Sequence, residues 1–270
     1  MNLDRTTERY FRLLEALGQA VIATDAAGMI TLWSPAAETL YGWRADEVIG
    51  RDILEVTPMD MSRSQGQEIM QALARGELWS GEFHVRTRQG KSFTASVTDI
   101  PLLNEARTVA GVVGVSAVSR APTKLRPLLT RFAAACDEIW PTQIGFNIEV
   151  AAKVSLPATE PHLIQLLAVL VLLYADTLDR GSDVEVTAGP AEKSLFTDFG
   201  LAFASSAMYI RIDRRNAHAS YTVLRSLPLS AEPTKYVAAL VRMVGGMLIA
   251  GTAPEGLSAM HLFLPFERRH

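Results

Sequence analysis

Hydrophobic and polar positions in the first 120 residues predict one long helix, then strands and short helices. Over residues 4–17, apolar residues recur at spacings of three and four, which indicates a helix with one apolar face. A tight turn at 25–28 separates two short apolar runs, which predicts a hairpin. Ser34 before Pro35 is typical of a helix start, and Gly42 of a helix end. Further strands are expected at 79–87, 92–101 and 109–118.

In the second half, longer helical stretches alternate with strands. Helical spacing of apolar residues predicts helices at 124–139, 161–178 and 233–244. Short apolar or alternating runs between them predict strands near 146–150, 184–186, 208–213, 221–227, 247–251 and 260–265. Helices and strands mixed around one sheet indicate an α/β sandwich. We therefore expect an α+β fold with two domains, 1–120 and 121–270.

Composition and charge exclude several function classes. With 270 residues, 49% hydrophobic and 20% charged, the chain can fill two cores. A net charge of -3 gives no electrostatic case for nucleic-acid binding. The single Cys136 excludes an intrachain disulfide and a cysteine-rich metal site, and it fits a reducing compartment. The charged N-terminus and the lack of an apolar run of ~20 residues predict a cytoplasmic protein without secretory signal or membrane span.

The first domain carries motifs that resemble the PAS family. They are Asp25-x-x-Gly28-x-Ile30, Ser34-Pro-Ala-Ala-Glu38, Tyr41-Gly-Trp43 and Glu47-Val-Ile-Gly50-Arg51. The resemblance implies a five-stranded antiparallel sheet with helices on one side. These elements would enclose a pocket that senses a ligand, a cofactor or a protein partner.

The sequence argues against two kinds of cofactor in this pocket, a covalently attached flavin and a haem. Photochemical flavin sensors of the family carry a cysteine after the Gly50 motif, and residues 52–58 contain none, so no covalent flavin adduct is expected. The predicted helix 63–75 has no histidine to serve as an axial haem ligand. We expect either a small organic ligand or no ligand and only a protein contact. Candidate pocket residues are Trp33, Trp43 and Trp79, with aromatic core packing as the alternative interpretation.

The second domain, from residue 125 to 266, resembles the ATP-binding domain of sensor histidine kinases and other GHKL proteins. The resemblance rests on Glu160-Pro-His-Leu-Ile-Gln-Leu-Leu, on 239–256 and on the last strand, 261–265. It implies an asparagine on the long helix that helps to hold Mg²⁺, but the equivalent turns of this chain hold Leu170 and Tyr174. Neither side chain offers an oxygen suited to a hard cation.

Two further segments of the nucleotide site also differ from the GHKL pattern. The adenine-contacting Asp-x-Gly-x-Gly segment is replaced by 213–217, in which Asp213 is kept while Arg215 and Ala217 replace the glycines that let a purine approach. Asp213 is then expected to be a surface turn residue. The phosphate-binding loop corresponds to 227–233, which contains no glycine. We therefore expect a degenerate nucleotide site without metal.

The chain also leaves no room for a phosphoacceptor hairpin, because the first domain ends near Val118 and the next helix begins by Lys124. Pro122 interrupts any helical relay between the domains. The resemblance thus implies a pseudo-histidine kinase of bacterial two-component signalling, non-catalytic, that docks a kinase, a response regulator or another signalling protein. The alternative is a divergent GHKL kinase that phosphorylates a partner in trans.

Self-association is a further expectation. Tyr10, Leu14 and Leu17 lie on the apolar face of the N-terminal helix, and helices before PAS domains commonly pair. This face would form a homodimer surface. Packing of the helix within its own chain would satisfy the same residues equally well.

Overall fold

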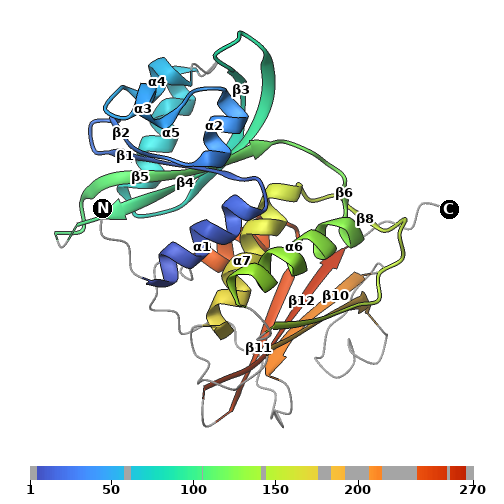
Figure 1. Ribbon diagram of the computed structural model, residues 1–270. Coiled ribbons are helices and arrows are strands. Elements are labelled where there is room, and N and C mark those ends of the chain that lie inside the picture. The colour runs from blue at the N-terminus through green and yellow to red at the C-terminus, as the bar shows by residue number, and fades with distance from the viewer. Residues whose placement is uncertain are drawn as a thin grey trace. The chain divides into compact units, whose positions relative to one another are not determined.

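The computed structural model describes residues 5–57, 62–104, 106–140, 144–175, 184–191, 207–214, 236–253 and 256–265. Its contacts divide the chain into two units (Figure 1). The N-terminal unit is Leu14–Ser119, and the C-terminal unit is Arg120–His270 together with Met1–Leu13. The division after Ser119 lies next to the expected domain boundary. The first turns of the N-terminal helix differ from expectation, because they group with the C-terminal unit.

The N-terminal unit is a five-stranded antiparallel sheet in the order β2-β1-β5-β4-β3. Helices cover one face of this sheet (Figure 1). This confirms the antiparallel sheet with flanking helices that the resemblance implies. The strands are β1 (Ala20–Asp25), β2 (Ile30–Trp33), β3 (Trp79–Arg86), β4 (Ser92–Leu103) and β5 (Val109–Val118), and the helices are α2 (Pro35–Tyr41), α3 (Ala45–Val48), α4 (Ile53–Val56) and α5 (Arg63–Ala74).

Local sequence sets the ends of α2. The Ser34 hydroxyl oxygen accepts a hydrogen bond of 3.2 Å from the Ala37 N–H, and Pro35 occupies the first turn, where no N–H is needed. Gly42 ends the helix at φ 79°, in the left-handed region that favours glycine. Ser34 also accepts a hydrogen bond of 2.9 Å from the Val21 N–H, which ties α2 to β1.

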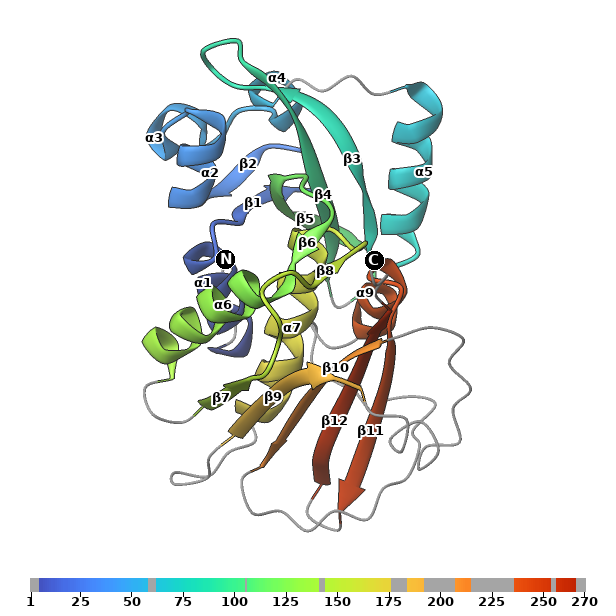
Figure 2. The same ribbon diagram turned by 90° about the vertical axis from the view of Figure 1, so that its right-hand side faces the viewer.

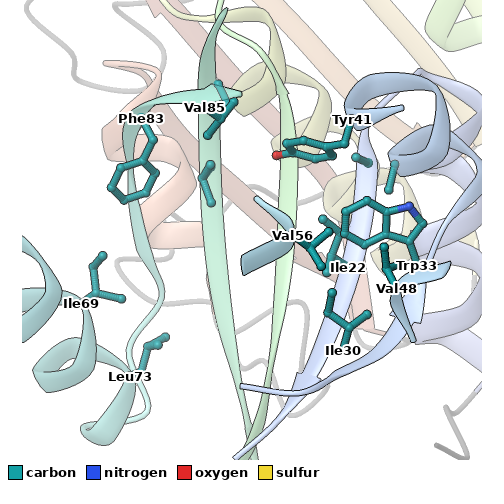
Figure 3. Close-up of a cluster of buried hydrophobic side chains, with 14 residues drawn as sticks. Ile22, Ile30, Trp33, Tyr41, Val48, Val56, Ile69, Leu73, Phe83 and Val85 are labelled. Atoms are coloured by element: carbon teal, nitrogen blue, oxygen red, sulfur yellow. The ribbon is translucent and has the colours of Figure 1, made fainter. Parts of the chain in front are cut away.

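Alternation along each strand decides which side chains face the helices. On β4, Phe93, Ala95 and Val97 face inward and join the hydrophobic core. Figure 3 shows this core, with Ile69 and Leu73 of α5 on one side. Ile22 of β1 and other core residues lie on the other side. Asp99 is the next inward position of β4 after Val97, so a carboxyl group continues an apolar row.

The C-terminal unit has a second five-stranded sheet, in the order β11-β12-β10-β9-β7 (Figure 2). The β7–β9 pair is parallel and the others are antiparallel. The elements are α1 (Arg5–Ala16), which continues into the N-terminal unit, β6 (Thr123–Lys124), α6 (Leu125–Ile139), β7 (Ile144–Ile148), β8 (Ser155–Leu156), α7 (Glu160–Ala175), β9 (Val184–Pro190), β10 (Ala207–Arg214), α9 (Val237–Met243), β11 (Met247–Ala253) and β12 (Gly256–Pro265).

Helices α6, α7 and α9 lie on one face of this second sheet (Figure 1). Phe132 of α6 meets Phe146 of β7 edge to face, with ring centroids 6.2 Å apart. The α+β character of the whole chain is thereby confirmed. The strand expected at 221–227 lies outside the described residues.

The apolar face of α1 is buried within the single chain. Tyr10, Leu14 and Leu17 are 3%, 0% and 8% exposed. These side chains therefore pack within the chain, which is the alternative given above for them. Self-association of the chain stays a prediction.

Candidate functional site

The N-terminal unit has a cavity of about 1350 Å³, partly open to solvent, between the inner face of its sheet and α4 and α5. Most of the lining side chains are apolar. Ile22, Leu73, Phe83, Val85 and Val97 belong to this lining. Pockets for drug-sized ligands commonly have volumes of about 300–1,000 Å³. The cavity therefore has room for a small organic molecule.

Asp99 contributes a carboxyl group to this wall. In the strand register it lies opposite Gly114 of β5, and a Cβ atom at Gly114 would lie only 3.1 Å from the Asp99 Oδ1 atom. Asp99 has intermediate exposure, and it lines the cavity. Burial raises the pKa of Asp99 to about 7. Among the described residues, no hydrogen bond or ion pair reaches this carboxyl group.

Two hydroxyl groups lie near Asp99 on the same wall. The Tyr41 hydroxyl donates a hydrogen bond of 2.9 Å to the Ser116 Oγ atom. Burial raises the pKa of Tyr41 to about 12; the hydrogen bond to Ser116 opposes this rise, and the charge of Asp99 adds to it. Ser116 lies two residues from Gly114 on β5, so it faces the cavity beside Asp99. The three side chains make one polar region in an apolar wall.

The other carboxyl groups of the cavity lining already have local partners. Asp25 Oδ1 accepts hydrogen bonds from the Ala27 and Met29 N–H groups in the β1–β2 turn. Asp52 Oδ1 accepts a hydrogen bond of 2.8 Å from the Leu54 N–H at the start of α4. Asp99 differs from both because its environment is apolar and its oxygens stay available to a ligand.

A family model described as "PAS fold" matches residues 8–116. The chain contains a PAS domain. Among curated proteins it is 23% identical over 120 residues to the human high affinity cAMP-specific and IBMX-insensitive 3',5'-cyclic phosphodiesterase 8A, and 22% identical over 121 residues to the mouse protein. These matches cover 44% and 45% of this chain but only 14% and 15% of the two enzymes. The chain thus spans a small part of their length.

Two solved structures are also similar. The PAS domain of a Colwellia psychrerythraea protein is 21% identical with a TM-score of 0.37, over 42% of this chain and 95% of that one. The Erythrobacter litoralis EL346 blue-light activated histidine kinase is 12% identical with a TM-score of 0.45, over 95% of this chain and 98% of that one.

In the described part of the chain, no helix is long and apolar enough to cross a membrane.

None of the three predicted tryptophans lines the PAS cavity. Trp33 is 5% exposed and donates a hydrogen bond from Nε1 to the Trp43 carbonyl oxygen at 3.1 Å. The Trp43 ring lies against the guanidinium groups of Arg51 and Arg88, 5.3 and 4.9 Å from the ring centroid. The third ring, that of Trp79, is turned along β3 over Gly81 and stacks on Phe83. The three rings pack in or against the hydrophobic core of the N-terminal unit, which is the other interpretation given for them above.

The lining also bears on the haem and flavin alternatives. It contains neither histidine nor cysteine among the described residues, and its Met70 is 64% exposed. The described part of the chain contains no group of three His, Cys, Asp or Glu that could hold a metal ion. The polar groups of the described lining include the carboxyl groups of Asp25, Asp52 and Asp99 and the hydroxyl groups of Tyr41 and Ser116.

Of the predicted nucleotide-site residues, the structure describes the side chains of Leu170 and Asp213 only, and these two do not converge. Leu170 is 0% exposed within α7. Asp213 is a strand residue of β10, and its Oδ2 atom lies 2.7 Å from Arg211 Nη2. Burial raises the pKa of Asp213, and Arg211 opposes that rise. The prediction that Asp213 is a surface turn residue is wrong, because β10 continues past it. Arg215 and the side chain of Tyr174 lie outside the described residues.

Successive side chains of β10 point to opposite faces of the sheet, and Asp213 points away from the helices. Phe146 of β7 contacts Phe132 of α6, and Val186 and Ile212 lie beside Phe146 in the strand register, on the same face of the sheet. Ile210 and Ile212 are therefore buried on the face that α6 contacts. Asp213 therefore points to the opposite face of the sheet. Leu170 and Asp213 thus lie on different sides of it.

Proposed function

We propose that the chain is a non-catalytic signalling regulator. Its PAS domain senses a small molecule, and its C-terminal unit is a degenerate GHKL-type domain that docks a kinase or a response regulator. The observation that carries the sensory part is the PAS cavity of about 1350 Å³, whose lining side chains are mostly apolar and include the polar region of Asp99, Tyr41 and Ser116. A cavity of this size with few polar groups is typical of small-molecule sites.

Two features support the absence of catalysis. A magnesium–triphosphate site needs accessible oxygen ligands. Leu170 offers none and is fully buried, while Asp213 is held by Arg211 on the other face of the sheet. A phosphoryl-transfer site built from these two positions would require rearrangement of both α7 and β10.

The connection between β5 and β6 gives a third argument. It consists of residues 119–122, which are not helical, and α6 begins directly after the short strand β6. A helical hairpin that carries a phosphorylatable histidine has no place between these elements. This supports a regulator that does not phosphorylate itself.

Nucleotide binding and phosphorylation test the proposal. The full chain is incubated with γ-labelled ATP and Mg²⁺, and the binding of a non-hydrolysable ATP analogue is measured by calorimetry. We expect no label on the protein and no binding at micromolar concentration. Stoichiometric binding, lost in Asp213→Ala but kept in the exposed control Asp46→Asn, would favour the divergent kinase that acts in trans.

A further inference from the structure

Asp99 holds an unusual position in the PAS domain. It ends the inward row of Phe93, Ala95 and Val97 on β4, and it faces the cavity between the apolar side chains of β3 and the small residues of β5. Gly114 lies opposite Asp99 and has no side chain, whereas a methyl group there would crowd the Asp99 Oδ1 atom at 3.1 Å. The fold thus brings a carboxyl group into the cavity and leaves its oxygens accessible from inside.

We propose that Asp99 anchors an apolar small molecule that carries a protonated amine, held with its hydrocarbon part in the PAS cavity. This inference rests on the proposed sensory function and names the chemical class of the ligand. The ammonium group would donate to the Asp99 carboxylate. The hydroxyl groups of Tyr41 and Ser116 offer further acceptor oxygens beside it.

The charges around the cavity favour a cation over an anion or a neutral molecule. A carboxylate in apolar surroundings is costly unless it is paired, and an ammonium ion supplies the missing charge. Among the residues that the structure describes, the other ionisable groups of the lining are Asp25, Tyr41, Asp52 and the exposed Arg107 on the β4–β5 turn. No lining residue of β3 or α5 is charged. A ligand carboxylate would meet repulsion at Asp99, while a neutral alcohol would gain a hydrogen bond but no charge pairing.

The site predicts a distinct dependence on pH. Without ligand the pKa of Asp99 is about 7, and a bound ammonium ion favours the ionised form. Below that value Asp99 must release a proton when the amine binds. An aliphatic amine stays protonated throughout this range. The affinity for the amine should therefore fall about 90-fold from pH 8 to pH 5.

Probes of similar shape that differ only in one functional group test whether the charge of the ligand decides its affinity. Tryptamine, tryptophol and indole-3-propionate share an indole ring and differ in an ammonium, a hydroxyl or a carboxylate group. A larger pair, 9-(aminomethyl)anthracene and 9-anthracenemethanol, covers a bigger ring system. Binding of each probe to the full chain is measured by calorimetry at pH 8 and pH 5, in buffers of different ionisation enthalpy. The variants are Asp99→Asn and the exposed control Asp46→Asn.

We expect the amines to bind at least about tenfold tighter than the alcohols at pH 8. This advantage should disappear in Asp99→Asn and persist in Asp46→Asn. In the wild type it should be smaller at pH 5 than at pH 8, and binding of the amine at pH 5 should release a proton. The wild-type pH series needs no variant, so it decides the question even if Asp99→Asn folds poorly.

Equal binding of amines and alcohols to the wild type would overturn the amine site, while the PAS cavity would remain a ligand site. No binding of any probe at millimolar concentration would also overturn the amine site. The proposed signalling function is judged separately by the nucleotide experiment, so the two failures are distinguishable.

Discussion

Replacement of Asp99 with asparagine should stabilise the PAS domain at alkaline pH and have little effect at acidic pH. Asn has nearly the same shape as protonated Asp but cannot ionise. The folded state holds Asp99 with a pKa of about 7, against an ordinary value of 3.8. Between these two values the folded protein binds more protons than the unfolded chain, so its stability decreases as pH rises and then stays low.

The size of the effect follows from the two pKa values. The rise from 3.8 to about 7 corresponds to about 4 kcal/mol, at about 1.36 kcal/mol for each pKa unit. This is an upper value, because water that enters the cavity solvates the carboxylate. We expect Asp99→Asn to gain about 1–4 kcal/mol in free energy of unfolding at pH 8, and close to nothing at pH 4.

Urea denaturation followed by tryptophan fluorescence measures this gain. Trp33, Trp43 and Trp79 lie in the PAS domain, whereas Trp140 lies in the C-terminal unit, so the signal reports mainly on the PAS domain. Asp46→Asn is the control, since Asp46 is exposed and ion-paired with Arg44. The reasoning is refuted if Asp99→Asn destabilises the domain at pH 8, or if its effect is the same at pH 4 and pH 8.

Three further substitutions test other contacts by urea denaturation. Ser34→Ala removes an acceptor from two backbone N–H groups and should cost about 2 kcal/mol, and a loss near zero would contradict the helix cap. Tyr41→Phe removes the hydrogen bond to Ser116 and should cost about 1 kcal/mol, with no further loss when Ser116→Ala is added. Leu170→Asn places an amide in the apolar interior of α7 and should cost about 2–5 kcal/mol. It should not create ATP binding, and micromolar binding by calorimetry would count against the degenerate site.

Much of the PAS domain could be predicted because its elements follow local rules. The Ser34–Pro35 start and the Gly42 end of α2 are set by capping chemistry within a few residues. The strands of the sheet show clear alternation. Helix α4 (Ile53–Val56) was missed, because a single turn is too short to show helical periodicity.

The site was harder to predict because burial depends on neighbours in space. An aspartate at the end of an alternating row looks the same on an exposed edge strand and on a central strand. Asp99 faces the cavity in the middle of the sheet because β4 lies between β3 and β5, which only the sheet order decides. The sequence also left open whether the tryptophans line the pocket or pack in the core, since their ring orientations depend on packing. Asp213 was misplaced because the match to a loop motif hid the continuation of β10 to Arg214.

The titration of the Asp99 side-chain carboxyl carbon, followed by NMR in the full chain, tests the central claim most directly. We predict a midpoint near pH 7 without ligand, and a lower midpoint in the presence of saturating tryptamine. A midpoint close to the ordinary value of 3.8 would show that the carboxyl group is hydrated and already stabilised, and would contradict the account.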